Sequence, residues 1–245
     1  MGSAVGIALL DELYQKYPHE MVENPRLMRF VGECFLHNQR DNKFEANKRI
    51  RKYLIWRRES FGDLEDHSLG EDQQLKSQIL TGYMSILPKR LPDGSAIIFS
   101  RQRLHQPSLY SAKQTIQYMH FMLMTAIEKD PSLATCGVIL LNNFAGAEPC
   151  NADVNTSMAI LNAFKNFLPV RVGNIIGVNP PLVRRFLFPL VSAFVSGIMI
   201  APTSAHLQNI LSVPISYLPT ELGGEVEVTP PEDVLKYLIE GGFVV

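Results

Sequence analysis

The side chains that most often carry catalysis or bind metals are few and poorly spaced in this sequence. The histidines, at positions 19, 37, 67, 105, 120 and 206, show no HxH or HxxxH spacing, and the cysteines at 34, 136 and 150 form no CxxC pair. Such spacings bring metal ligands to one point, so we expect no metal site. GxGxxG, GxxxxGK[ST] and GxSxG motifs are absent too. We therefore expect no cofactor and no enzymatic activity.

Charged side chains are also scarce in the second half of the chain. Between Leu133 and Leu218 only Glu148 and Asp153 are acidic, and after Arg185 no Asp, Glu, Lys or Arg occurs until Glu221. The apolar stretch that begins at Phe186 contains a proline and a glycine and is shorter than the ~20 apolar residues of a membrane-spanning helix. We predict a helix near 187–195 and a strand near 197–200, lying on core, on bilayer or on a bound lipid.

The spacing of apolar and turn residues predicts the elements that position these side chains. The first third is helical, with expected helices at 24–38 and 43–62, followed by an acidic linker. Strands are then expected at Ala96–Ser100, Gly137–Leu141 and around 172–178, with helices at 111–130 and 151–169 between them. Such alternation predicts an α/β fold with a mainly parallel sheet. We place a helical N-terminal module at 1–70 and a second domain at 71–245.

Composition narrows the possible partners and the compartment. The chain has 245 residues, of which 46% are hydrophobic and 19% charged, and its net charge is −1. A chain so nearly neutral has no global field for nucleic acid, so we expect no nucleic-acid partner. The odd number of cysteines and the absence of a basic n-region before the first apolar run favour a reducing, cytoplasmic location.

Two features point to a buried ligand. Residues 118–124 make nearly the whole circumference of one helix apolar, which is typical of plain core but also of a lined cavity. Asn142 and Asn143 follow a buried strand, at the edge where open α/β sheets bind ligands, although they could equally cap the strand. Leaving the apolar side chains of 186–195 in water costs about 1.5–3 kcal/mol each, so this segment must be covered.

Several segments, in order along the chain, resemble the CRAL-TRIO family of lipid carriers. They are "RFVGECFL", "KFEANKRIRKYLIWRRE", "LPDGSAIIFSR", "GVILLNNFAG", "FLPVRVGNIIGVNPPLVRRFLFPLV" and, most specifically, "YLPTELGGE" at Tyr217–Glu225. The resemblance implies a helical N-terminal module before a CRAL-TRIO domain, with a sheet floor, flanking helices and a mobile gate helix over an apolar pocket. It also implies that the protein extracts a lipophilic molecule from one membrane and releases it at another.

The resemblance is stronger to the branch that carries tocopherol and retinaldehyde than to the phosphatidylinositol branch. The latter holds its headgroup with a Glu where Val170 stands here, and with a Lys that "TSAHLQNILSVP" lacks. Arg171 matches a basic place at which the first branch reads membrane phosphoinositides, whereas the neighbouring basic place is Gly173. Arg184 and Arg185 could compensate, so we expect a transient membrane contact through Arg171, Arg184 and Arg185.

The resemblance also implies the residues around the ligand. We expect the pocket to be lined by Ile116, Met119, Leu123, Val138, Ile160, Ala163, Phe164, Val172 and Ile175 and closed by Phe186, Leu187, Leu190, Val191 and Phe194. His120 and Asn142 are the expected polar contacts, although a satisfied core histidine is the commoner use of such a residue. Tocopherol, a retinoid, a carotenoid or a similar lipid fits first; a phospholipid transfer protein and a lipid-sensing regulatory module remain the alternatives.

Overall fold

The computed structural model describes residues 11–18, 25–40, 42–61, 72–179 and 198–240. Its centre is a five-stranded sheet in which spatial order follows chain order. The strands are β1 (Met84–Ile86), β2 (Ala96–Arg101), β3 (Val138–Asn143), β4 (Val172–Val178) and β5 (Ile198–Ala201). Strand β1 is antiparallel to β2, and the other pairs are parallel. The fold is therefore the α/β class with a mainly parallel sheet that the sequence predicts.

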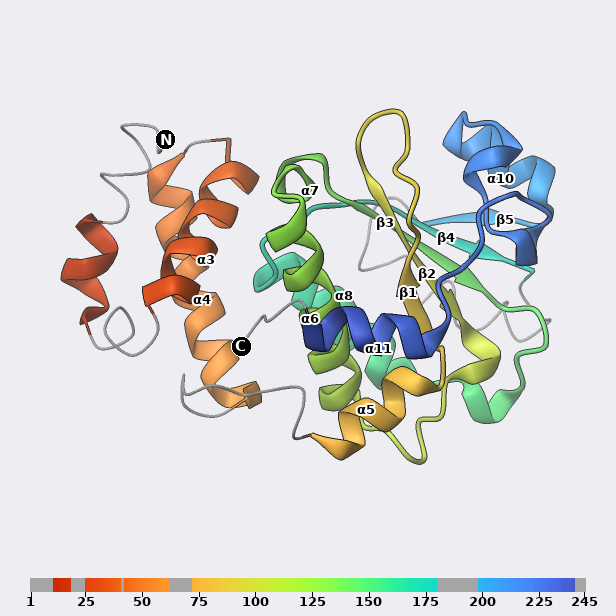
Figure 1. Ribbon diagram of the computed structural model, residues 1–245, viewed down its shortest axis with the longest axis horizontal. Helices are drawn as coiled ribbons and strands as arrows, with labels where there is room; N and C mark the ends of the chain where they lie inside the picture. The colour runs from red at the N-terminus through yellow and green to blue at the C-terminus, as the bar shows by residue number, and fades with distance from the viewer. Residues whose placement is uncertain (1–10, 19–24, 41, 62–71, 180–197, 241–245) are drawn as a thin grey trace.

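Helices α6 (Ala112–Lys129), α7 (Ser132–Cys136) and α8 (Val154–Asn166) connect the parallel strands and lie together beside the sheet (Figure 1). Ser111 and Gln114 form a reciprocal capping box at the start of α6, and the Asp153 side chain accepts a hydrogen bond from the Asn155 amide at the start of α8. Because successive crossovers run in one direction along the sheet, these helices cover the same face. This face presents Ala96, Ile98, Val138 and Leu140, which join one hydrophobic core with α6 and α8.

The opposite face of the sheet has its own core. Ile97, Phe99, Ile139 and Leu141 pack there with residues of α10 (Ser204–Leu211) and of the segment 213–226. Strand residues alternate between the two clusters because successive side chains of a strand point to opposite faces. The remaining short elements are η1 (Gln102–Leu104), η2 (Pro149–Asn151), η3 (Ile215–Tyr217) and η4 (Thr220–Leu222).

The N-terminal helices form a layer on the far side of α6 and α7 from the sheet (Figure 1). They are α3 (Pro25–Asn38) and α4 (Lys43–Phe61), and residues 11–16 are also helical. The core cluster of α6 continues into α4 through Ala46, Ile50 and Tyr53. Helix α11 (Pro231–Glu240) packs on α5 (Gln73–Leu80) and α6. Among the helices described, none combines the length and the apolar character that crossing a bilayer requires.

Predicted and observed elements agree within a few residues. The strand expected at Gly137–Leu141 is β3, and the helix expected at 111–130 is α6. The short strand expected after the apolar stretch is β5. The helix expected at 187–195 lies outside the described residues, as do the predicted gate residues and Arg184 and Arg185.

Candidate ligand-binding site

All nine residues that we expected to line a pocket belong to one hydrophobic cluster or pack against it, on the α6–α8 face of the sheet. Six of them are buried with an exposed fraction of 9% or less: Ile116, Met119, Leu123, Val138, Ala163 and Phe164. Their position confirms that α6, α8 and the strands meet here. Whether they line a cavity stays a prediction.

The other three, Ile160 on α8 and Val172 and Ile175 on β4, are only half-buried. Ile175 pairs with Leu140 in the sheet register and therefore shares its face. Together they form an apolar edge of the cluster, which we call the α8–β4 edge (Ile160, Val172 and Ile175). A ligand lying against this edge would remove the remaining apolar surface from water, which is the main driving force for binding a lipid.

Asn142 lies near the carboxyl end of β3 on this same face, two residues beyond Leu140. Its Oδ1 accepts hydrogen bonds from the Ser100 hydroxyl at 2.7 Å and from the Gln102 amide at 3.3 Å. Gln102 also donates to the Ser100 hydroxyl at 2.9 Å. These bonds fix the orientation of the Asn142 amide and leave its Nδ2 as a donor. The carboxyl edge of the sheet thus carries a polar group next to the apolar cluster, and sequence reasoning missed Ser100 and Gln102.

His120 faces the N-terminal helices rather than a solvent-filled site. Its Nε2 forms a 3.0 Å hydrogen bond with the Tyr53 hydroxyl, and the rings of Tyr53, Trp56 and Phe61 surround it at 5.0–5.8 Å between centroids. The side chain is fully buried. Burial, helped by the Arg57 charge, lowers the pKa of His120 from 6.5 to about 3. His120 is thus a neutral core histidine joining α4 to α6, and we do not include it among the proposed ligand contacts.

Arg171 lies at the amino end of β4, where its guanidinium donates to the carbonyl oxygen of Asn38 at the end of α3. Arg49 donates to the Asn38 side chain at 3.0 Å and to the Leu168 carbonyl at 3.0 Å. Burial is the main cause that lowers the pKa of Arg49, and the charge of the nearby Arg171 lowers it further. Arg171 therefore ties the sheet to the N-terminal helices, and the sequence analysis did not identify Asn38 or Arg49.

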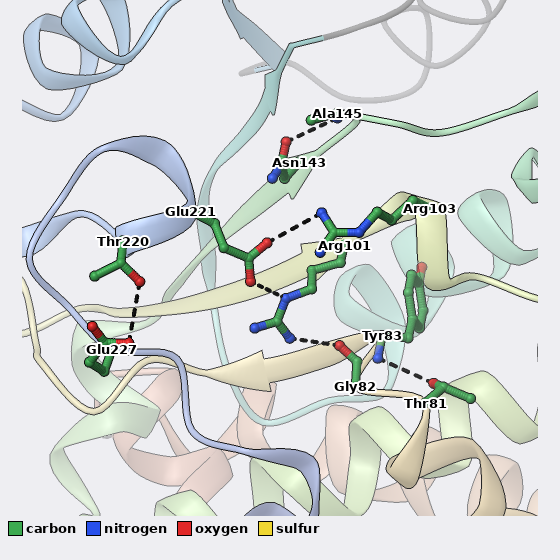
Figure 2. Close-up of polar contacts among 10 residues, drawn as sticks. All are labelled: Thr81, Gly82, Tyr83, Arg101, Arg103, Asn143, Ala145, Thr220, Glu221 and Glu227. Atoms are coloured by element: carbon green, nitrogen blue, oxygen red, sulfur yellow. Dashed lines mark hydrogen bonds and ion pairs between the residues drawn. The ribbon is translucent and has the colours of Figure 1, made fainter.

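The most specific motif in the sequence closes the domain through Glu221 (Figure 2). Glu221 pairs with the Nε of Arg101, which is the last residue of β2, and with Arg103 at 3.5 Å. Arg101 also donates to the Gly82 carbonyl at 2.8 Å. The Arg101 side chain is only 12% exposed. The pair fastens segment 218–226 to the sheet, so Glu221 has a structural role.

Within the described ranges, no three His, Cys, Asp or Glu side chains lie close enough to hold a metal ion. The three cysteines are free. What the α6–α8 face assembles is an apolar cluster with one oriented amide at its edge, which suits an apolar ligand bearing a single polar group.

These features define a class: an α/β domain with an apolar cluster and an oriented amide on one face of a mainly parallel sheet. The sequence profile of the CRAL/TRIO domain matches residues 80–224, more than half of the chain. The protein therefore belongs to the CRAL/TRIO family of lipid-binding domains, as its motifs led us to expect.

The chain is similar to several known proteins. It is 26% identical over 195 residues to human tyrosine-protein phosphatase non-receptor type 9, covering 76% of this chain and 32% of the relative. It is 22% identical over 232 residues to human alpha-tocopherol transfer protein-like, covering 89% and 64% respectively. The chain thus spans about a third of the first relative's length. The crystal structure of Sfh5 superposes with a TM-score of 0.54 at 12% identity, covering 98% of both chains. That likeness concerns the fold.

Proposed function

We propose that the protein is a non-enzymatic carrier that binds a hydrophobic small molecule, such as a tocopherol, a retinoid, a carotenoid or a similar lipid, and transfers it between membranes. The observation that carries this proposal is the half-buried α8–β4 edge beside the oriented amide of Asn142. An apolar ligand body covers Ile160, Val172 and Ile175, and its single polar group accepts a hydrogen bond from Asn142 Nδ2. Membership of a lipid-binding family supports the same assignment.

A ligand with a large charged headgroup fits this chain less well. The place where the phosphatidylinositol branch has a Glu is Val170, which is 1% exposed and packed in the same core cluster as Leu168. A carboxylate there would be buried without a partner, at a cost of several kcal/mol. The segment from Thr203 to Pro214 contains no lysine. We therefore favour a ligand with a hydroxyl or carbonyl group over a phosphoinositol lipid.

Two parts of the proposal rest on sequence resemblance. The gate is proposed at Phe186, Leu187, Leu190, Val191 and Phe194, whose apolar side chains would cover the ligand in the closed state and contact the bilayer in the open state. Transient membrane contact is proposed through Arg171, Arg184 and Arg185, with a phosphoinositide as the anionic partner. Arg171 would serve this contact with the guanidinium nitrogens that do not bind Asn38.

The test is organic extraction and native mass spectrometry of the purified protein, compared with two tryptophan variants. Ile160→Trp fills space at the α8–β4 edge and is expected to remove most of the bound lipid, whereas Asn162→Trp changes an exposed position of the same helix. Both variants should keep the unfolding temperature of the parent within a few degrees, because neither position is fully buried. Transfer of the extracted lipid between vesicles, with and without phosphoinositide, measures the carrier step.

The outcomes separate the alternatives. An isoprenoid that is lost only in Ile160→Trp supports the proposal. A co-purifying phospholipid would reassign the protein to phospholipid transfer. An empty protein whose Ile160→Trp variant binds added lipids as the parent does would leave a regulatory module as the better description.

A further inference from the structure

A concave surface lies on the N-terminal helices, and none of its lining residues belongs to the proposed lipid site. It is a groove of about 940 Å³ between residues 12–17 and the outward side of α4 from Lys43 to Ile55, and we call it the α4 groove. Phe44 and Ile55 line it and are 76% and 52% exposed. Helix α4 buries its other side against α3 and α6. Large apolar side chains that stay this exposed in one recess mark an interaction surface.

The walls of the α4 groove are strongly basic. Lys16, Lys43, Lys48, Arg51 and Lys52 all line it, against a single acid, Glu12. The Glu12 carboxylate already has partners within the chain: it pairs with Lys43 Nζ at 2.8 Å and accepts a hydrogen bond from the Asn47 amide at 2.5 Å. The bond to Lys43 is the main cause that lowers the pKa of Glu12, so this carboxylate stays charged and its charge is balanced by Lys43. An apolar floor between positive walls is complementary to a partner that presents apolar and acidic side chains together.

Two cations of the wall, Arg51 and Lys52, are available to such a partner. Arg51 and Lys52 are exposed, and no carboxylate in the described part of the chain pairs with either. Lys48 has only an exposed pair with Glu45 at 3.8 Å. Phe44, Arg51 and Ile55 are spaced by seven and four residues, so they share one side of α4. The apolar and the basic contacts therefore alternate along a single helical surface.

We propose that the α4 groove binds an acidic amphipathic helix of a protein partner. The twelve residue steps from Lys43 to Ile55 extend over about 18 Å of helix, which matches roughly twelve residues of a partner helix. The partner's apolar side chains at i, i+3, i+4 and i+7 pack on Phe44 and Ile55, and its Glu and Asp side chains reach Arg51 and Lys52. A planar membrane surface does not fill a recess between two helices, so a peptide explains the concave shape better than a bilayer does.

The experiment uses the full chain and a fluorescein-labelled 14-residue helical peptide with Leu on one face and Glu on the other. Fluorescence anisotropy should show binding at low salt that weakens severalfold at 300 mM salt, because exposed charges are screened. Arg51→Glu and Phe44→Ser should each weaken binding by about fivefold or more. Both positions are exposed, so an unchanged unfolding transition is expected for both variants. Lys236→Glu on α11 is the matched control, since it makes the same charge change at an exposed site that packs elsewhere.

Amide hydrogen exchange then locates the peptide. Protection is expected in residues 11–18 and 43–55, and protection elsewhere would overturn the proposal. So would equal affinity for a mirror peptide with Lys in place of Glu, or an affinity that Arg51→Glu leaves unchanged. Phosphatidylserine vesicles are tested in parallel: vesicle binding that depends on Phe44 and Arg51, in a protein that does not bind the peptide, would assign the groove to a membrane instead.

Discussion

Replacing His120 with glutamine should flatten the pH dependence of stability between pH 7 and pH 5. His120 is fully buried in α6 among Tyr53, Trp56 and Phe61 of α4, and burial lowers its pKa to about 3. The unfolded chain holds the same imidazole at its ordinary pKa of 6.5. Between pH 6.5 and pH 3 the His120 imidazole is therefore protonated in the unfolded state and neutral in the folded state. Stability from this residue is fully present above pH 6.5 and is lost progressively as the pH falls toward 3.

The size of the effect follows from this difference. Each pH unit between the two pKa values contributes about 1.4 kcal/mol, so lowering the pH from 7 to 5 should cost the parent protein about 2 kcal/mol of unfolding free energy through His120 alone. Urea unfolding followed by circular dichroism at the two pH values measures the loss. A glutamine side chain does not titrate, and its amide can still bond the Tyr53 hydroxyl, so His120→Gln should lose about 2 kcal/mol less over this range than the parent.

The control is His37→Gln, which makes the same substitution at an exposed histidine of α3. Comparing slopes rather than absolute stabilities removes any packing cost of the substitutions. If the parent and His120→Gln lose the same free energy between pH 7 and pH 5, the imidazole is not held neutral in the folded state. The inference that the N-terminal helices seal His120 away from water would then fail.

Two further substitutions test the C-terminal signature. Glu221→Gln removes the charge that binds Arg101 and Arg103 and should lower the free energy of unfolding, measured in urea, by about 1 kcal/mol, because Arg101 is mostly buried while Glu221 keeps some solvent screening. The control Glu240→Gln breaks an exposed pair on α11 and should cost nothing measurable. Equal effects of the two substitutions would contradict a role of Glu221 in holding segment 218–226 on the sheet. Gly224→Ala would drive a Cβ into the Leu218 carbonyl group and should destabilise the protein by about 2 kcal/mol or more in the same assay. The control is Gly173→Ala, whose Cβ meets only the Val138 carbonyl oxygen at 3.8 Å, an ordinary contact. A Gly224→Ala protein as stable as Gly173→Ala would mean that the turn is looser than described.

Local patterns were enough to predict most of the sheet and its helices. The apolar run at 138–141 and the turn at 92–94 each identify a strand, and the apolar spacing within 111–130 and 151–169 identifies two helices. These signals lie within a few residues of the elements they define. Strand β1 has only three residues, too few for a periodic signal, and the placement of α10 on the second face depends on contacts between distant segments, which periodicity does not encode.

Distant contacts also explain what the sequence could not show about the predicted site residues. Residues 118–124 are apolar around most of α6, so spacing alone could not tell which side of His120 meets α4; its partner Tyr53 is 67 positions away. Arg171 is an exposed cation, as the sequence suggested, but the sequence could not show that its guanidinium also donates to the Asn38 carbonyl oxygen 133 positions away. Asn142 lies at the end of β3, where the sequence predicted it, and strand alternation puts it on the face of Val138 and Leu140; its contact with a ligand stays a prediction.

The position of the proposed lipid site follows from how α6 and α8 cover the strands on one face of the sheet. On the α6–α8 face, β2 and β3 meet α6 and α8 directly, and Ile98, Val138 and Leu140 are buried. Toward β4, on that same face, Val172 and Ile175 are only half-buried, as are Ile160 on α8 and Ile200 on β5. Helix α6 connects β2 to β3 and α8 connects β3 to β4, so these two helices cover the first parallel strands more fully than they cover β5 and the outer side of β4. A lipid held against β4 would cover the apolar side chains that α6 and α8 leave half-buried. A substitution at the α8–β4 edge should therefore reduce lipid binding without lowering stability, whereas one in the tightly packed centre should lower both.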